Sequence, residues 1–188
     1  MAKRIIDVGQ NETKVVYDIV FGEHKESSVI LSLNGSGAKG RIYGIFIGKN
    51  SDECKIWHEV VHNAPDTKSE ILVKGILEGG AKASYDSLIK MNEGVRGAEG
   101  HQKEDTLLLS KKAKINSVPH LEISHNDVKC SHSVSTTNVD KDKLFFMNSR
   151  GIKTEAAIHE LVLGHVAPVL DKIDDEDVKQ QVLSLLRP

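Results

Sequence analysis

The chain has 188 residues, of which 39% are hydrophobic and 28% charged, and its formal net charge is −2 at pH 7. These values are typical of one folded domain and exclude global disorder. The balanced charge gives no support to nucleic-acid binding, and no apolar run reaches the roughly 20 residues of a membrane-spanning helix. The two thiols, Cys54 and Cys130, are too few for a disulfide framework, so we expect reduced thiols and a cytoplasmic protein. Residues 1–7 carry charge but no long apolar run, which predicts that there is no signal peptide.

Short apolar runs, often β-branched, follow one another from about residue 13 to residue 123. Clusters of Gly, Asn, Asp and Ser separate them, a pattern typical of strands joined by turns. The runs that we expect to be strands are residues 15–17, 29–33, 42–47, 71–73, 88–89 and 107–109. The residues alone leave two mainly β architectures open, a sandwich of antiparallel strands and a solenoid.

A weak internal repeat is compatible with the solenoid. Gly37-Ala38-Lys39, Gly80-Ala81-Lys82 and Lys112-Ala113-Lys114 each lead into a new strand. The interval from the first of the three alanines to the second is longer than the interval from the second to the third. These unequal spacings suit coils of roughly 20 residues with uneven loops better than a fixed repeat.

After about residue 138 the pattern becomes helical. Thr154 is a good N-cap for a helix with apolar residues at helical spacing, and we expect this helix to end before Pro168. The acidic run at residues 174–177 favours the start of a second helix through the helix dipole. That helix carries one apolar stripe, formed by Val178, Val182, Leu185 and Leu186. We therefore expect a β body over residues 1–137 and a helical segment over residues 138–188.

The segment His58-Glu59-Val60-Val61-His62 matches the H-E-x-x-H signature of zinc hydrolases. That chemistry needs both histidines on one face of a helix, with the glutamate beside a metal-bound water. Here the two valines favour extended structure, Pro65 follows closely, and strand signals lie on both sides. We expect strand or turn residues on a β surface, and we keep a zinc-dependent hydrolase using His58, Glu59 and His62 as an alternative function.

A glycine-rich segment at residues 35–42 resembles a phosphate-binding loop. Arg41 and Ile42 stand where Lys and Ser or Thr would contact phosphate and magnesium. Nucleotide hydrolysis by this chain is therefore not expected, and tight turns explain the glycines.

The segment Cys130-Ser131-His132 carries the most chemistry. In a strand, a thiol and an imidazole two residues apart point to the same side, and both groups bind iron or zinc. Two ligands do not complete a mononuclear site, so His120, His125, Asp127 or a partner chain would have to supply the others. From the spacing alone, a buried thiol beside a hydrogen-bonded histidine is the simpler explanation.

The order of these segments resembles one family, the SufB/SufD proteins of iron–sulfur cluster assembly. The resemblance runs from about residue 58 to residue 164 and is carried by Lys74-Gly75-Ile76, Gly100-His101-Gln102, Pro119-His120-Leu121-Glu122-Ile123, Asp127-Val128-Lys129-Cys130-Ser131-His132, Leu144-Phe145-Phe146 and Ser149-Arg150-Gly151-Ile152. It implies a right-handed parallel β-helix with a small C-terminal helical segment, which decides between the two β architectures. The later segments are more similar to SufD, so the resemblance implies a short, core-only, SufD-like member.

The resemblance also implies a non-enzymatic assembly subunit without catalytic residues. In SufD-like proteins the histidine of this motif lies at the contact with SufB, where the nascent cluster is thought to form. We therefore expect Cys130 and His132 to bind metal or a transient iron–sulfur cluster. The expected partners are a SufC-like ABC ATPase and a second SufB/SufD-type chain, or a second copy of this chain in a homodimer. The residues expected to lie at the ATPase contact are Ser149, Arg150, Gly151 and Ile152.

The chain departs from the family pattern at Ala113 and within Tyr85-Asp86-Ser87, and Cys130-Ser131-His132 replaces the acidic-His-acidic pattern of SufB. Ala113 stands six residues before Pro119, where SufB-type scaffolds place a functional cysteine. The Tyr-Arg-Gly of the family is Tyr85-Asp86-Ser87 here. These departures leave a third function open, that of a purely structural β-helix binding module.

Overall fold

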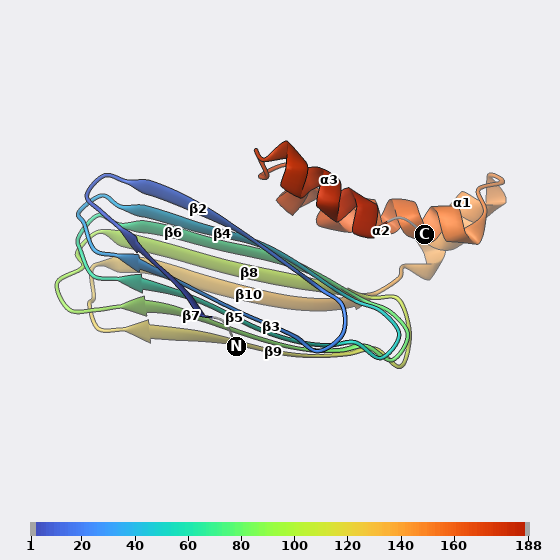
Figure 1. Cartoon of the computed structure of the whole chain (residues 1–188), viewed down its shortest axis with the longest axis horizontal. Coiled ribbons are helices and arrows are strands. Elements are labelled where there is room, and N and C mark those ends of the chain that lie inside the picture. The colour runs from blue at the N-terminus through green and yellow to red at the C-terminus, as the bar shows by residue number, and fades with distance from the viewer. Residues whose placement is uncertain (1–2, 187–188) are drawn as a thin grey trace.

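The computed structural model describes residues 3–186, so residues 1, 2, 187 and 188 lie outside the described residues. Met1 and Ala2 belong to the segment of residues 1–7 for which we predicted no signal peptide. Within residues 3–186 a β body is followed by a helical tail (Figure 1). The strands are β1 (Lys3–Val8), β2 (Thr13–Phe21), β3 (Lys25–Leu33), β4 (Lys39–Gly48), β5 (Glu53–His62), β6 (Lys68–Leu77), β7 (Lys82–Met91), β8 (Ala98–Leu108), β9 (Lys114–Ile123) and β10 (Val128–Asn138). The helices are α1 (Lys141–Ser149), α2 (Thr154–Leu170) and α3 (Glu176–Leu185).

Successive strands alternate between two sheets. One sheet has the order β1-β3-β5-β7-β9 and the other the order β10-β8-β6-β4-β2, and the neighbours pair in parallel. We call them the odd sheet and the even sheet. Each coil contributes one strand to each sheet, so the chain forms a parallel β-helix, as predicted, and the antiparallel sandwich is wrong.

The coils are longer than the sequence repeat predicted. Lys39 of β4 pairs with Lys68 of β6, and Lys68 pairs with Glu99 of β8, so each of these pairs marks the start of a new coil. The coil length expected from the alanine segments is therefore wrong, because each coil holds two strands of about ten residues and also two turns. The alanine segments do lead into strands, since Lys39, Lys82 and Lys114 begin β4, β7 and β9.

Polar side chains stack along one edge of the β-helix with the period of the coils. Asn63 Nδ2 donates to Asn34 Oδ1 at 2.7 Å, and Asn92 Nδ2 donates to Asn63 Oδ1 at 2.6 Å. These three asparagines follow strands β3, β5 and β7, one in each successive coil. The ladder holds the coils in register at the point where the chain leaves the odd sheet.

Two apolar clusters hold the fold together. The first fills the space between the sheets, and Leu31, Val60 and Ile89 of the odd sheet are completely buried in it. The second lies on the outer face of the even sheet, where Ile45 and Ile76 pack against Val166 of α2. Burial of this second cluster explains why the helical tail covers that sheet.

The tail differs from the sequence predictions at both ends of α2. The expected N-cap Thr154 is the first helical residue, and the N-cap position belongs to Lys153, which makes no side-chain cap bond. The helix also continues through Pro168 to Leu170, because Val169 and Leu170 are buried against the second cluster. This burial outweighs the backbone hydrogen bond that Pro168 cannot donate.

The second predicted helix is confirmed as α3. Asp175 caps it by accepting from the N–H groups of Asp177 and Val178, and its apolar stripe packs into the second cluster through Val182. Because the tail shares this cluster with the even sheet, the boundary between residues 137 and 138 stays a prediction. Within residues 3–186, no helix is long and apolar enough to cross a bilayer.

Candidate functional site

The last coil of the β-helix, formed by β9 and β10, is open. Each of these strands pairs with one neighbour only, β7 or β8, so its other edge is free of strand partners within the described chain. Side chains that would face the interior of a longer solenoid are consequently half-buried or exposed. Ile123 is 49% exposed and Val134 is 39% exposed, although both lie on inward rows.

The structure places Cys130 and His132 on the inward row of this open coil. In the β8–β10 pairing, Cys130 lies beside Gly100 and His132 lies beside Gln102, and both partners face the interior. Cys130 is half-buried and packs against the interior cluster, whereas His132 is exposed. The prediction that the thiol and the imidazole point to the same side is confirmed by this register.

Burial raises the pKa of the Cys130 thiol, and a backbone hydrogen bond at Ser131 opposes this rise only in part. The thiol is therefore protonated at neutral pH in the free chain. A soft metal ion would displace that proton when it binds, so metal binding here would release a proton.

The further ligands considered from sequence do not gather around this pair. His120 lies on the outer face of the odd sheet, where its ring is tilted against the Trp57 ring with the centroids 6.4 Å apart and its Nε2 is 4.0 Å from Asp86. His125 lies in the turn after β9, where its Nδ1 accepts from the backbone N–H of Asp127. Within residues 3–186, no cluster of three or more His, Cys, Asp and Glu residues could hold a metal ion.

The H-E-x-x-H segment lies on strand β5, as expected, which removes the helical geometry of a zinc hydrolase site. Its histidines do not lie on a β surface, however, because both face the interior. Burial lowers the pKa of His62 to about 4, and its ring nitrogens bond with the hydroxyls of Thr67 and Ser69, each at 2.8 Å. Glu59 points to the opposite face and accepts from Trp57 Nε1 at 3.0 Å.

His58 belongs to a buried polar chain that sequence reasoning missed. Asp18 Oδ2 accepts from His58 Nε2 at 3.0 Å, and the hydroxyl of Tyr85 lies 3.3 Å from His58 Nδ1. Burial raises the pKa of Asp18, but hydrogen bonds and charges from His58, Ser27 and Arg4 outweigh it and leave the pKa below its usual value. The only sequence signal for this buried polar chain was a polar residue among the apolar inward residues of each of β2, β5 and β7.

A second buried carboxylate lies nearer the open coil. Glu104 is 2% exposed and accepts from Thr106 and Ser117. Burial raises its pKa more than these hydroxyls lower it. The interior of the solenoid is therefore polar along part of its length, with a carboxylate held close to the last coil.

The predicted partner contact lies at the junction of α1 and α2. Ser149 ends α1, Arg150 caps it, and Gly151 has a φ of +84°, which lets the chain turn into α2. The guanidinium of Arg150 lies 3.6 Å from the centroid of the Phe146 ring. Ile152 is 39% exposed, so the segment is accessible.

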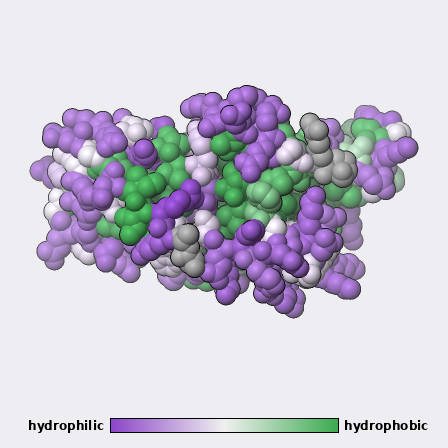
Figure 2. Space-filling view, in the orientation of Figure 1, coloured by the Kyte–Doolittle hydropathy of each residue, from purple (hydrophilic) through white to green (hydrophobic). Residues whose placement is uncertain are grey.

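Helix α1 presents apolar side chains to solvent. Phe145 is 74% exposed and Phe146 is 56% exposed, and no residue of α1 is buried. In Figure 2, some hydrophobic residues are visible among hydrophilic ones at the end of the molecule where α1 lies. An exposed aromatic pair on a helix without a buried face is typical of a protein-binding surface.

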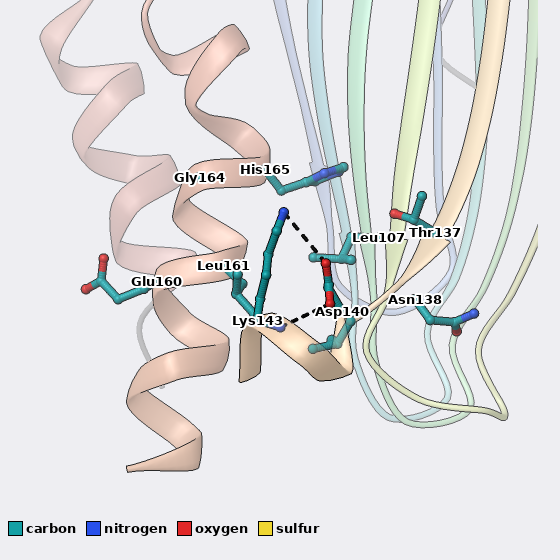
Figure 3. Close-up of a pocket in the computed structure, with 10 residues that line it drawn as sticks. Leu107, Thr137, Asn138, Asp140, Lys143, Glu160, Leu161, Gly164 and His165 are labelled. Carbon is teal, nitrogen blue, oxygen red and sulfur yellow. Dashed lines mark hydrogen bonds and ion pairs between the residues drawn. The ribbon is translucent and has the colours of Figure 1, made fainter. Parts of the chain in front are cut away.

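A cavity of about 700 Å³ separates α1 and α2 from the end of β10. Figure 3 shows His165 of α2 pointing toward the sheet, and Lys143 of α1 beside Asp140. Nε2 of His165 bonds with the carbonyl oxygen of Asp105 at 3.1 Å, which ties α2 to the even sheet. The helix α1 is therefore joined to the body across a hollow, while α2 is fixed to it.

The chain matches the family described as SUF system FeS cluster assembly, SufBD core domain, over residues 2–165. It is 31% identical over 144 residues to an iron–sulfur cluster assembly SufBD family protein of Synechocystis sp., a match that covers 77% of this chain and 30% of that protein. The SufD protein of Escherichia coli (strain K12) is 30% identical over 152 residues, 81% of this chain and 36% of SufD. The SufB protein of Bacillus subtilis (strain 168) is 28% identical over 144 residues, 77% of this chain and 31% of SufB.

The chain spans about a third of the length of these curated relatives. The matched residues include the β-helix from β1 to β10, the open coil with Cys130 and His132, and most of α2. On this match, the chain belongs to the SufBD core domain family of iron–sulfur cluster assembly.

Proposed function

We propose that this chain is a non-catalytic subunit of an iron–sulfur cluster assembly complex. It pairs with a second SufB/SufD-type chain, or with a copy of itself, and it binds a SufC-like ABC ATPase. The observation that carries the proposal is the open coil, because it presents a thiol and an imidazole at a surface that strand pairing would cover. The SufD-like character is part of the same proposal.

The pairing surface is the free edge of β9 and β10. Unpaired backbone groups on a strand edge bind another strand readily, and soluble proteins usually protect such an edge. The half-exposed inward side chains Ile123 and Val134 add apolar area to it. A partner that covers this coil would bring its own ligands to Cys130 and His132.

The cluster is cargo in this proposal. Cys130 and His132 fit it in chemistry, because thiolate and imidazole are both ligands of iron–sulfur clusters. Two ligands from one chain do not complete a cluster site. The partner chain therefore supplies the rest, and the free chain holds no complete cluster.

The ATPase surface is α1 with the segment that follows it. Phe145 and Phe146 supply large exposed aromatic rings, and Ser149, Arg150, Gly151 and Ile152 form the adjoining turn. The cavity between α1 and the body leaves room for this helix to shift when the ATPase changes shape. Movement of α1 would then reach the open coil through β10, whose last residue is two positions from the N-cap of α1.

Capture of a SufC-like ABC ATPase by the purified chain tests the docking part. We expect the wild-type chain to bind the ATPase, and a Phe145→Ser, Phe146→Ser double variant to lose binding. Removing residues 140–188 is a poorer test, because it would uncover the apolar outer face of the even sheet. Equal binding by the double variant would show that α1 is not the contact.

Light scattering at tens of micromolar tests the pairing part. We expect a dimer, or a heteromer when a SufB/SufD-type partner is added. A Val134→Lys variant places a charge on the free edge and is expected to reduce pairing. A strict monomer under all these conditions would favour the alternative of a purely structural binding module.

A further inference from the structure

One buried atom near the open coil lacks a partner. Within residues 3–186, Gln102 Oε1 is the only buried side-chain nitrogen or oxygen without a hydrogen bond, and Gln102 is 5% exposed. An unpaired amide oxygen in the interior destabilises the fold, so its presence calls for an explanation.

The orientation of this amide is fixed by its other end. Gln102 Nε2 donates to the backbone carbonyl oxygen of His120 at 3.3 Å, on strand β9 across the interior. Exchanging the two amide atoms would set the oxygen of Gln102 against the oxygen of His120, and neither could donate. The unpaired atom is therefore an acceptor, and it needs either a donor or a cation.

The neighbours of Gln102 on the inward face of β10 are Cys130 and His132. His132 is the β10 partner of Gln102, and Cys130 lies two residues earlier on the same face. Adjacent strands lie about 4.8 Å apart, and positions i and i+2 of a strand lie about 6.6 Å apart. Three side chains that start from this small triangle can converge on one metal ion and leave a fourth position open.

The floor of this triangle is mostly apolar, with one hydroxyl, that of Ser69, which is bonded with His62 Nε2. Gly100 lies beside Cys130 in the pairing, and a Cβ on Gly100 would lie 3.0 Å from Ile89 Cγ2 and 3.1 Å from Met91 Cε. These side chains therefore occupy the space below the thiol. A thiolate, an imidazole and one neutral oxygen suit a divalent transition metal better than calcium or magnesium.

We propose that Gln102 Oε1 is a third metal ligand, which acts with Cys130 Sγ and the His132 imidazole on a divalent transition-metal ion at the open coil. The inference rests on the proposed function and deepens it, because it gives cargo iron a first attachment within one chain. The thiol proton passes to solvent when the metal–sulfur bond forms, and no electron transfer is required. A partner chain then occupies the open side of the ion.

Titration of the full, metal-free, reduced chain with Co²⁺ tests the proposal, because cobalt reports its ligands by absorbance. We expect a thiolate-to-cobalt band that is lost in Cys130→Ala. Cys54 does not interfere, since it is 1% exposed and burial raises its pKa to about 11. Gln102→Leu is expected to raise the Kd for Co²⁺ about tenfold or more, and to change the intensity of the ligand-field bands as water replaces the amide oxygen. Gln102→Glu, which keeps an oxygen at this position, should restore binding.

His101→Ala is the matched control. His101 immediately precedes Gln102 on β8 but faces outward, where its Nδ1 is bonded with Ser131 Oγ at 2.7 Å. This variant should bind Co²⁺ as the wild type does. Circular dichroism melting of each variant confirms that it is folded.

The outcomes separate the inference from the proposed function. Wild-type affinity in Gln102→Leu, with loss in Cys130→Ala and His132→Ala, would overturn the role of Gln102 and leave the Cys130–His132 site intact. Weaker binding by Gln102→Leu with unchanged ligand-field bands would also overturn direct ligation, because Gln102 would then only position His132. A cobalt spectrum that no variant alters would overturn both the third ligand and the site itself.

Discussion

The unpaired oxygen of Gln102 predicts that Gln102→Leu makes the metal-free chain more stable. An unsatisfied buried amide oxygen costs about 1–3 kcal/mol, and the substitution removes this cost. It also removes the bond from Nε2 to the His120 carbonyl, which at 3.3 Å contributes about 1 kcal/mol or less. Leucine has a similar size, and it would lie beside Ile71 of β6 on the same inward row. We therefore expect the free energy of unfolding to rise by about 1 kcal/mol.

Urea unfolding followed by circular dichroism measures this change at one fixed protein concentration, with chelator present so that no metal contributes. The matched control is Gln102→Glu, which buries an ionisable carboxyl at the same position and is expected to destabilise the metal-free chain. A fall in the free energy of unfolding of more than about 1 kcal/mol in Gln102→Leu would refute the reasoning. Such a fall would mean that Oε1 has a stabilising partner in solution. The combination of greater stability with weaker cobalt binding is typical of a residue retained for function.

Three other predictions concern the buried carboxylates and α1. Asp18→Asn should lower the free energy of unfolding by about 3–5 kcal/mol, because it breaks a buried charge network. The pKa of Asp18 is lower in the folded chain than in the unfolded chain. The stabilisation by Asp18 is therefore present above about pH 4 and is lost as the pH falls further. Glu104 has the opposite effect on stability. Its pKa is raised in the folded chain, so its ionisation opposes folding. Glu104→Gln should therefore stabilise the chain at pH 7 but not at pH 3. The Phe145→Ser, Phe146→Ser double variant should keep the wild-type melting temperature, because neither ring is buried.

These three predictions are checked by urea unfolding at several pH values and by thermal melting. An acid transition of the wild type that Asp18→Asn leaves unchanged would contradict the first. A Glu104→Gln variant that is less stable than the wild type at pH 7 would contradict the second. A drop of more than a few degrees in the double variant would show that α1 packs against the body more closely than its exposure indicates.

The solenoid could be expected from the residues only in part. Strand runs such as residues 29–33 and 42–47 lie within β3 and β4, because buried runs rich in β-branched and aromatic residues leave a strong local signal. The predicted coil length was wrong because the alanine segments precede strands of different sheets. Ala38 precedes β4 of the even sheet, whereas Ala81 precedes β7 of the odd sheet. The asparagines at positions 34, 63 and 92 carry the true period, which becomes evident only once their ladder is seen.

The candidate site was predictable where it depends on neighbours in sequence. Cys130 and His132 share a face because side chains alternate along a strand. The proposed third ligand could not be predicted, because Gln102 becomes the neighbour of His132 only through the pairing of β8 with β10, which lie a whole coil apart in the chain. The predicted end of α2 was also wrong because it depends on tertiary contacts. Local propensity places the end before Pro168, but burial of Val169 and Leu170 extends the helix to Leu170.

Anaerobic reconstitution with ferrous iron and sulfide tests the central claim most directly. The wild-type chain alone should remain largely colourless, because one chain does not supply a full set of cluster ligands. With its second SufB/SufD-type chain and the ATPase present, it should develop sulfide-to-iron absorbance, and Cys130→Ala and His132→Ala should each reduce that absorbance. Equal absorbance of the complex in both variants would contradict the account and leave Cys130 and His132 as structural residues.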